Sequence, residues 1–216
     1  MNDLNFAHHF LAAQNSRSAP TLLLLHGTGG DENSLLQIGR DLAPDANLLS
    51  PRGKVLENGM PRFFRRLREG VFDEDDLILR AAQLAKFIAD AAQCYGFKAK
   101  NVIAIGYSNG ANIAAALLIL QPHVLRAAIL LRAMTPLLPE IQPDLKGVEI
   151  LLASGERDTM VPNENVQTLA QMLREAGANV THNWQSAGHE LAREEILVAR
   201  DWLEANCRDA EAQGKQ

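Results

Sequence analysis

Short apolar runs alternate along the chain with longer segments that have helical periodicity. Five of the short runs are mostly apolar: Thr21–Leu25, Leu48–Ser50, Val102–Ile105, Ala127–Leu131 and Val148–Ala153. Runs of this kind suit strands that are buried on both faces, and Val180–Gln185 is predicted to be the last strand. Because helical segments separate the runs, we predict a mostly parallel, twisted sheet with helices on both faces.

Four segments are predicted to be helices. Asp73–Tyr95 has one apolar face, begins with acidic residues and is followed by Gly96, as expected of an amphipathic helix. Ala111–Leu120 is apolar all round, which indicates a helix enclosed by the rest of the protein. Asn163–Glu175 and Leu191–Asn206 complete the set.

The composition suits an ordinary globular protein. A length of 216 residues predicts one domain, residues 1–216, and the polar end 208–216 is predicted to be disordered. Apolar residues make up 47% of the chain and charged residues 22%, which excludes collagen and a largely disordered chain. The net charge of 21 − 26 = −5 disfavours a nucleic-acid partner, because a phosphodiester backbone is itself negative.

The chain is predicted to be cytoplasmic, with no membrane insertion. Its longest apolar run, Ile113–Leu120, has 8 residues, whereas a helix that spans a bilayer needs about 20. Met1–Phe10 contains no Lys or Arg and so lacks the basic region of a signal peptide. Cys94 and Cys207 have no second Cys or His at the spacing of metal ligands, so we expect two reduced thiols and no metal site.

A serine nucleophile is predicted at Ser108. The segment Gly106-Tyr107-Ser108-Asn109-Gly110 has the pattern G-x-S-x-G, directly after one predicted strand and directly before a predicted helix. This is the context of a nucleophile elbow, in which a tight turn pushes the serine hydroxyl out at the end of the sheet. The alternative is a glycine-rich turn with an idle serine.

A serine nucleophile needs a histidine base and a carboxylate that orients it, and on this kind of sheet the chain order is Ser, Asp or Glu, then His. Asp158 and His189 each follow a predicted strand, at the sheet edge where ligands bind in open α/β sheets. Glu156 is the nearest rival for the acid. The alternatives are a solvated turn acid and a surface histidine at the start of a helix.

Backbone N–H groups that could hold an oxyanion are predicted at Thr28 and Asn109. Thr28 belongs to the glycine-rich loop His26–Gly30, which follows the first predicted strand, and Asn109 follows the nucleophile. A phosphate-binding loop is the alternative, but the loop lacks a third glycine at the dinucleotide spacing and a following Gly-Lys-Ser/Thr. His26 is expected to brace the loop rather than act as a base.

Substrate contacts are sought around the same sheet edge. The basic and aromatic stretch Arg62–Arg68 is expected to leave that edge, where it could recognise an anion or form a solvated loop with its two phenylalanines packed inward. The segment Met134–Gly147 has only 14 residues with three prolines, so no lid domain is expected there. The candidate substrate contacts are Gly29, Phe64, Arg65, Met134 and Val161.

With these residues assembled, the chain resembles the carboxylesterase and phospholipase branch of the α/β-hydrolases, near the dienelactone hydrolases and acyl-protein thioesterases. It is most similar to small bacterial esterases associated with quinone stress. The shared motifs are His26–Glu32, Arg62–Asp76, Gly106–Asn112, Leu130–Arg132, Asp158–Pro162 and Gly188-His189. Dienelactone hydrolases have a cysteine where this chain has Ser108, and family members often have a proline where it has Ala133.

The resemblance implies an α/β-hydrolase fold, a Ser108, Asp158 and His189 triad, and Thr28 and Asn109 as oxyanion donors. It also implies no metal and no cofactor, and a possible homodimer. We therefore predict a serine hydrolase that cleaves small carboxylic esters through an acyl-enzyme intermediate. The alternatives are an acyl thioesterase or lysophospholipase with the same triad, and a ligand-binding protein on a hydrolase scaffold.

Overall fold

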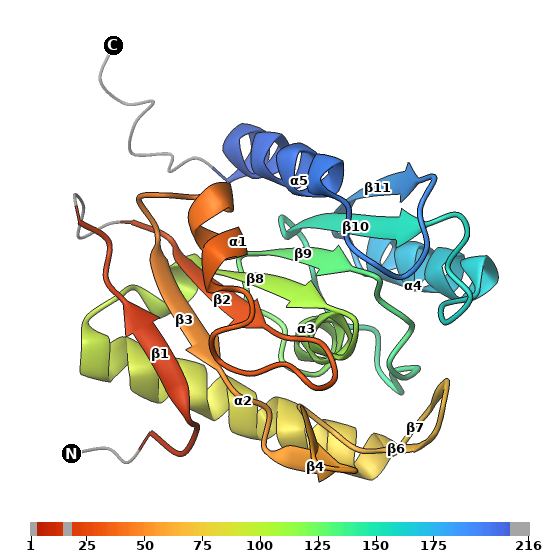
Figure 1. Ribbon diagram of the computed structural model, residues 1–216, viewed down its shortest axis with the longest axis horizontal. Coiled ribbons are helices and arrows are strands. Elements are labelled where there is room, and N and C mark those ends of the chain that lie inside the picture. Colours follow the sequence, from red (N-terminus) through yellow and green to blue (C-terminus); the bar gives the residue numbers. More distant parts are fainter. Residues whose placement is uncertain (1–3, 15–18, 208–216) are drawn as a thin grey trace.

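The computed structural model describes residues 4–14 and 19–207, so the predicted disordered tail 208–216 lies outside the described residues. Within these ranges seven strands form one sheet in the order β1-β3-β2-β8-β9-β10-β11, and all neighbouring pairs except β1 with β3 are parallel (Figure 1). The strands are β1 (His8–Leu11), β2 (Thr21–Leu25), β3 (Asn47–Pro51), β8 (Val102–Tyr107), β9 (Ala127–Leu131), β10 (Glu149–Gly155) and β11 (Asn179–Gln185). The predicted mostly parallel sheet is confirmed.

Helices cover both faces of this sheet, as predicted (Figure 1). One face carries α1 (Leu36–Leu42) and α5 (Arg193–Asn206), which pack on each other and on the sheet. The other face carries α2 (Glu74–Tyr95), α3 (Asn109–Leu120) and α4 (Asn163–Glu175), and a short 3-10 helix, η1, spans Ala99–Asn101.

The predicted helix limits reflect local signals. The Asp73 side chain caps α2 by accepting a hydrogen bond from the backbone N–H of Asp76 (3.1 Å), and Gly96 ends the helix in the left-handed conformation. All but the last residue of α3 are buried, which confirms that this apolar helix is enclosed.

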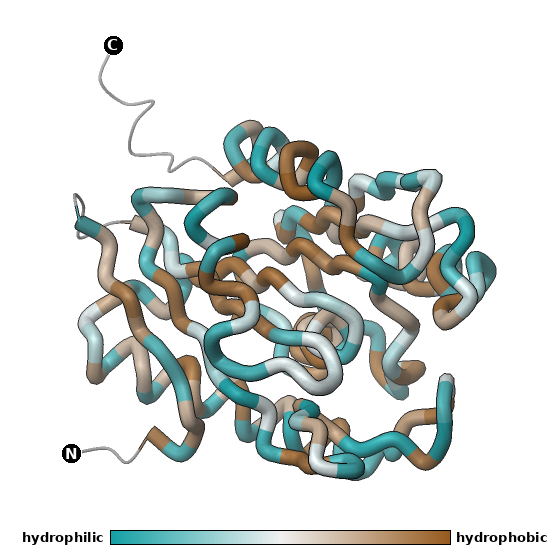
Figure 2. Tube along the Cα trace, in the orientation of Figure 1, coloured by the Kyte–Doolittle hydropathy of each residue, from teal (hydrophilic) through white to brown (hydrophobic). Residues whose placement is uncertain are grey.

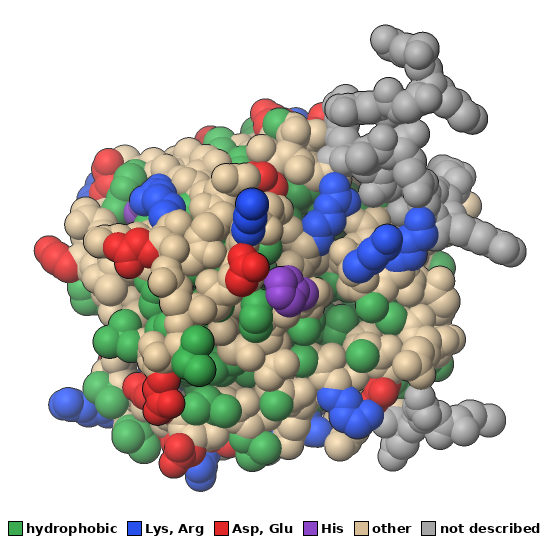
Figure 3. All heavy atoms as spheres, turned by 180° about the vertical axis from the view of Figure 1, so that it is seen from behind, with side chains coloured by type: hydrophobic (Ala, Val, Ile, Leu, Met, Phe, Trp, Pro, Cys, Tyr) green, Lys and Arg blue, Asp and Glu red, His purple; other side chains and the backbone are tan. Residues whose placement is uncertain are grey.

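The hydrophobic core consists of two layers, one on each side of the sheet. The central strands are uniformly hydrophobic, whereas α5 shows a hydrophobic stripe between hydrophilic turns (Figure 2). On the outer surface, basic and acidic side chains are interspersed among apolar ones (Figure 3). None of the described helices combines the length and the apolar character that crossing a membrane requires.

Two small hairpins replace the loop expected between the second predicted strand, Leu48–Ser50, and α2. The first pairs β4 (Val55–Glu57) with β5 (Met60–Arg62), and the second pairs β6 (Arg66–Arg68) with β7 (Val71–Phe72). The turn of the first hairpin is Asn58-Gly59, both residues with positive φ (52° and 79°). Asn-Gly between two short strands is a strong hairpin signal, and it was present in the sequence.

The two phenylalanines of the Arg62–Arg68 stretch pack inward, as the loop alternative predicted. Phe63 and Phe64, between the two hairpins, are packed inward with exposed fractions of 3% and 0%. The segment Met134–Gly147 contains no helix or strand.

Candidate active site

Ser108 occupies the turn between β8 and α3, where the chain leaves the carboxyl end of a central strand. Its backbone lies in a rare region for a non-glycine residue, with φ 52° and ψ −114°. The glycines on either side allow this turn. A Cβ on Gly106 would lie 2.5 Å from the carbonyl oxygen of Gly110, and a Cβ on Gly110 would lie 1.9 Å from that of Leu25. Only glycine fits either position, so the turn has the geometry predicted for a nucleophile elbow.

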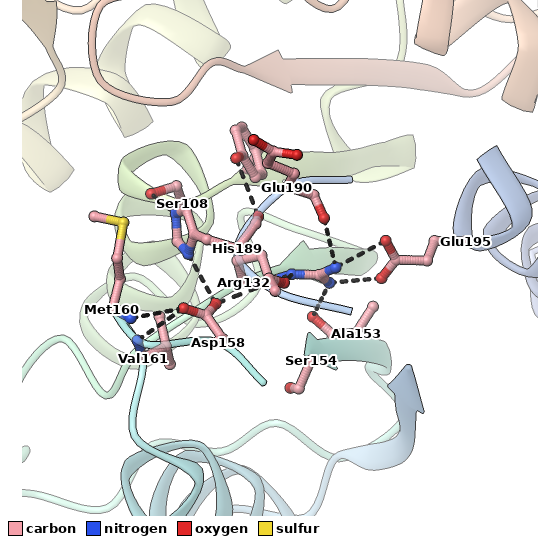
Figure 4. A network of polar contacts seen from close by, with 12 residues as sticks. Ser108, Arg132, Ala153, Ser154, Asp158, Met160, Val161, His189, Glu190 and Glu195 are labelled. Carbon is pink, nitrogen blue, oxygen red and sulfur yellow. Dashed lines mark hydrogen bonds and ion pairs between the residues drawn. The ribbon is translucent and has the colours of Figure 1, made fainter. Parts of the chain in front are cut away.

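Two hydrogen bonds connect Ser108 to His189 and His189 to Asp158 (Figure 4). Nε2 of His189 lies 2.9 Å from Oγ of Ser108, and Nδ1 of the same ring lies 2.8 Å from Oδ2 of Asp158. A neutral imidazole that donates from Nδ1 to the carboxylate leaves Nε2 free to accept the serine proton. The three side chains therefore have the arrangement that general-base activation of a serine requires.

Asp158 is fixed by its own loop. Its Oδ1 accepts hydrogen bonds from the backbone N–H groups of Met160 (2.8 Å) and Val161 (3.1 Å), so that Oδ2 faces the imidazole. The carboxylate is 1% exposed. Glu156, the rival acid, is exposed, and none of the described hydrogen bonds or ion pairs joins its side chain to His189.

The glycine-rich loop after β2 is braced by His26. Nδ1 of His26 donates to the carbonyl of Gly27 (2.7 Å), and Nε2 accepts from the backbone N–H of Gly53 (3.0 Å). Burial lowers the pKa of His26 below its ordinary value, which favours the neutral ring that this pair of contacts needs. The prediction that His26 braces the loop agrees with these contacts.

The two predicted oxyanion donors lie at the same pocket as Ser108. None of the turn, loop and cap hydrogen bonds of the described chain uses the backbone N–H of Thr28 or of Asn109. The side chains of Thr28 and Asn109 are held by hydrogen bonds from another segment. Arg62 donates from Nη1 to Oγ1 of Thr28 (2.6 Å), and the backbone N–H of Phe63 donates to Oδ1 of Asn109 (2.7 Å). Arg62 at the end of β5 and Phe63 after it therefore hold the two side chains in place and leave two backbone donors available.

The pocket beside Ser108 has a volume of about 50 Å³. Met134 and Val161, two of the candidate substrate contacts, line it. Gly29 does not line it: its N–H donates to the carbonyl of Pro61 (2.9 Å), and a Cβ there would face the side chain of Met60 at 3.6 Å.

Phe64 and Arg65 do not line the pocket either. Phe64 is 0% exposed and packs in the core, so its ring cannot reach a bound ligand. The side chain of Arg65 turns toward the start of α2, where Nη2 lies 2.8 Å from Oδ2 of Asp73. The residues of this stretch that line the pocket are Arg62 and Arg66, the last residue of β5 and the first of β6.

A buried arginine to which the sequence analysis assigned no role holds the His189 loop. Arg132, at the end of β9, has a positive φ of 59° and a side chain that is 0% exposed. It donates from Nε to the carbonyl of Gly188 (2.8 Å) and from Nη2 to the carbonyl of Glu190 (2.9 Å) (Figure 4). Its charge is matched by Glu195 of α5, whose two carboxylate oxygens lie 2.5 and 2.8 Å from Nη1 and Nη2.

Tyr107 completes this clamp by donating its hydroxyl to the carbonyl of His189 (3.1 Å). Side chains from β8 and from the end of β9 thus hold three consecutive carbonyls around the imidazole. The available signal was a charged residue directly after the fully apolar run Ala127–Leu131, at the carboxyl end of a central strand.

Known proteins are similar to almost the whole chain. Residues 6–207 match the family described as phospholipase/carboxylesterase. The protein MhqD of Bacillus subtilis (strain 168) is 50% identical over 181 residues, which cover 84% of this chain and 90% of MhqD.

Solved structures are similar over the same extent. The carboxylesterase of Bacillus cereus has a TM-score of 0.90 at 44% identity and covers 92% of this chain and 93% of its own. The carboxylesterase from Mesorhizobium loti has a TM-score of 0.87 at 33% identity, with 94% and 97% covered.

Proposed function

The chain belongs to the phospholipase/carboxylesterase family and is an ester-hydrolysing enzyme, and we propose that it cleaves small carboxylic esters through an acyl-enzyme formed on Ser108. The observation that carries this proposal is the unbroken line of hydrogen bonds from Ser108 through His189 to Asp158. Family membership excludes the ligand-binding alternative and leaves the substrate open.

In the first half of the reaction, Oγ of Ser108 attacks the carbonyl carbon of the ester while Nε2 of His189 takes the hydroxyl proton. Asp158 stabilises the imidazolium that forms. The backbone N–H groups of Thr28 and Asn109 hold the negative oxygen of the tetrahedral intermediate. When the intermediate collapses, His189 returns the proton to the departing alcohol and the acyl group stays on Ser108.

In the second half, a water molecule takes the place of the alcohol. His189 removes a proton from this water as its oxygen attacks the acyl carbon, and the same two N–H groups hold the second oxyanion. Collapse of this intermediate breaks the bond to Ser108, which regains its proton from His189. The products are one carboxylic acid and one alcohol, with the enzyme unchanged.

The dimensions of the pocket favour short acyl groups. Its volume is about 50 Å³, and the segment Met134–Gly147 forms no helix or strand that could cover a long acyl chain. A panel of p-nitrophenyl esters of increasing chain length, run beside acyl thioesters and lysophospholipids, tests this part of the proposal. Higher kcat/KM for long acyl chains or for thioesters would favour the thioesterase or lysophospholipase alternative.

Labelling with a fluorophosphonate, followed by mass spectrometry of the modified peptide, tests the nucleophile. We expect modification at Ser108 and none in Ser108→Ala. Ser154→Ala is a matched control, because Ser154 also contacts a histidine ring, Nε2 of His182 at 3.1 Å, but is only 2% exposed. Labelling that persists in Ser108→Ala or disappears in Ser154→Ala would refute the assignment.

Three further parts of the sequence reading stay predictions. They are a single domain over residues 1–216, a cytoplasmic location and a homodimer. Sedimentation of the purified protein checks the third of these.

A further inference from the structure

Two arginines lie side by side at the pocket and share one carboxylate. Nε of Arg66 lies 2.8 Å from Oε1 of Glu57, and Nε of Arg62 lies 3.1 Å from Oε2 of the same residue. Both arginines line the pocket beside Ser108. The Arg62 side chain is 4% exposed and that of Arg66 is 24% exposed, so both charges are partly removed from water.

This group carries an unbalanced positive charge. Two guanidinium groups face one carboxylate, and the third arginine at the pocket, Arg132, is paired with Glu195 and also lies 4.0 Å from the Asp158 carboxylate. Glu69 also lines the pocket, but it is exposed at the turn of the second hairpin, where water screens its charge. A partly buried cation without a full counter-charge favours an anion beside it.

The pocket is lined by several free hydrogen-bond donors and by the exposed carboxylate of Glu69, and Oε2 of Glu57 is buried beside Arg62 with no hydrogen-bond partner. None of the described hydrogen bonds or ion pairs uses the two Nη groups of Arg66, whose Nε alone contacts Glu57. Oδ1 of Asn109 and Oδ1 of Asn112 are both occupied by backbone N–H groups, and Nδ2 of Asn109 is buried with no partner. A ligand with several acceptor oxygens fits such a surface better than a purely apolar acyl chain.

We propose that the enzyme selects esters that carry a carboxylate near the scissile bond, and that Arg66 binds this carboxylate with Arg62 behind it. The inference rests on the proposed serine hydrolase function and adds its substrate class. A carboxylate suits Arg66, because the planar guanidinium presents two parallel N–H groups that match the two oxygens. Half-esters of short dicarboxylic acids have this chemistry, and the small volume of the pocket, about 50 Å³, limits the chain between the two ends.

The test compares esters of matched length with and without the second carboxylate. The substrates are the monoethyl esters of succinic and glutaric acid and the ethyl esters of butanoic and pentanoic acid, whose alkoxide leaving group is too poor for rapid attack by the substrate's own carboxylate. We expect kcat/KM to be at least about tenfold higher for the carboxylated ester of the better length, as a charge-assisted hydrogen bond would give. The preference should fall as salt is added, because ionic strength screens the attraction.

Arg66→Gln and Arg68→Gln form a matched pair of variants. Both remove one positive charge from β6, but Arg68 is exposed and does not line the pocket. Arg66→Gln should lower the ratio of kcat/KM for the carboxylated ester to that for the neutral ester by at least about tenfold. Arg68→Gln should leave the ratio within about twofold of the wild-type value.

Inhibition provides a readout that needs no variant. Succinate or glutarate should compete with a neutral ester more strongly than butanoate or pentanoate does. Equal inhibition by the two kinds of acid, or a wild-type preference for the neutral ester, would overturn the inference. So would an unchanged ratio in Arg66→Gln.

The outcomes also separate this inference from the proposed function. If neutral esters are hydrolysed and Ser108 is labelled but no carboxylate preference exists, only the substrate class is wrong. If none of the four esters is hydrolysed and Ser108 is not labelled, the serine hydrolase mechanism itself fails.

Discussion

Replacement of Arg132 or Glu195 by methionine should affect stability and activity in different ways. Both side chains are at most 1% exposed, and the guanidinium donates to the carboxylate and to the carbonyls of Gly188 and Glu190. Removing one partner leaves a buried, unpaired charge, which costs about 3 to 5 kcal/mol of unfolding free energy. We therefore expect Arg132→Met and Glu195→Met each to lower stability by this amount.

The double variant Arg132→Met/Glu195→Met should lose less stability than either single variant, because both members of the buried pair are removed together and the new side chains are apolar. Its kcat should nevertheless stay low. The carbonyls of Gly188 and Glu190 no longer have a donor from β9, so the loop that carries His189 is less well fixed. A displacement of the imidazole by about 1 Å corresponds to a loss of about 10²-fold in rate.

Urea denaturation gives the unfolding free energies, and kcat and KM for p-nitrophenyl acetate give the activity. Asp201→Asn is the control, because the Arg200–Asp201 pair (3.4 Å) is largely exposed and should change stability by less than about 0.5 kcal/mol. Tyr107→Phe removes the third contact of the clamp without changing any charge, so it should lower kcat with little change in KM. If the double variant recovers both stability and kcat, Arg132 does not position His189.

Three other predictions concern the catalytic acid, the turn at Ser108 and the buried histidines. Asp158→Asn should keep the fold but lower kcat by about 10⁴-fold; near-normal activity would move the role of the acid to another residue. Gly110→Ala should lower the stability of the protein far more than Gly59→Ala. A Cβ at position 110 would lie 1.9 Å from a backbone oxygen, whereas nothing lies within 4 Å of a Cβ at position 59. Equal melting temperatures of the two variants would contradict this. Burial lowers the folded-state pKa of His26 and His182 below the ordinary value of 6.5. The unfolded chain therefore binds more protons as the pH falls below about 6.5, and the unfolding free energy should decrease there by up to about 1.4 kcal/mol per pH unit for each ring. Urea denaturation at pH 7, 6 and 5 checks this, and His26→Asn should show a smaller decrease between pH 6.5 and 5 than the wild type.

Local patterns in the sequence were enough to predict the sheet and the elbow. Continuous apolar runs marked the central strands, and β2 and β9 have the predicted limits, because a strand buried on both faces tolerates few polar residues. The edge strand β1 was not predicted as an element of the sheet. Its residues are half-buried or exposed, so its pattern is weak.

The chemistry of Ser108, Asp158 and His189 was also accessible from the sequence, since each residue follows a strand whose carboxyl end lies at the same edge of the sheet. Connections in a parallel sheet bring these ends together whatever lies between them along the chain. Chain order and spacing therefore carried enough information to propose which side chains meet.

Only the tertiary structure decided which side chains of the Arg62–Arg68 stretch face the pocket. Phe64 and Arg65 point away and Arg66 points in, because two hairpins set the direction of each side chain. The Arg132–Glu195 pair is likewise a contact between residues 63 positions apart. Apolar burial follows from residue type along a short stretch, whereas the direction and partner of a polar side chain depend on elements that are distant in the chain.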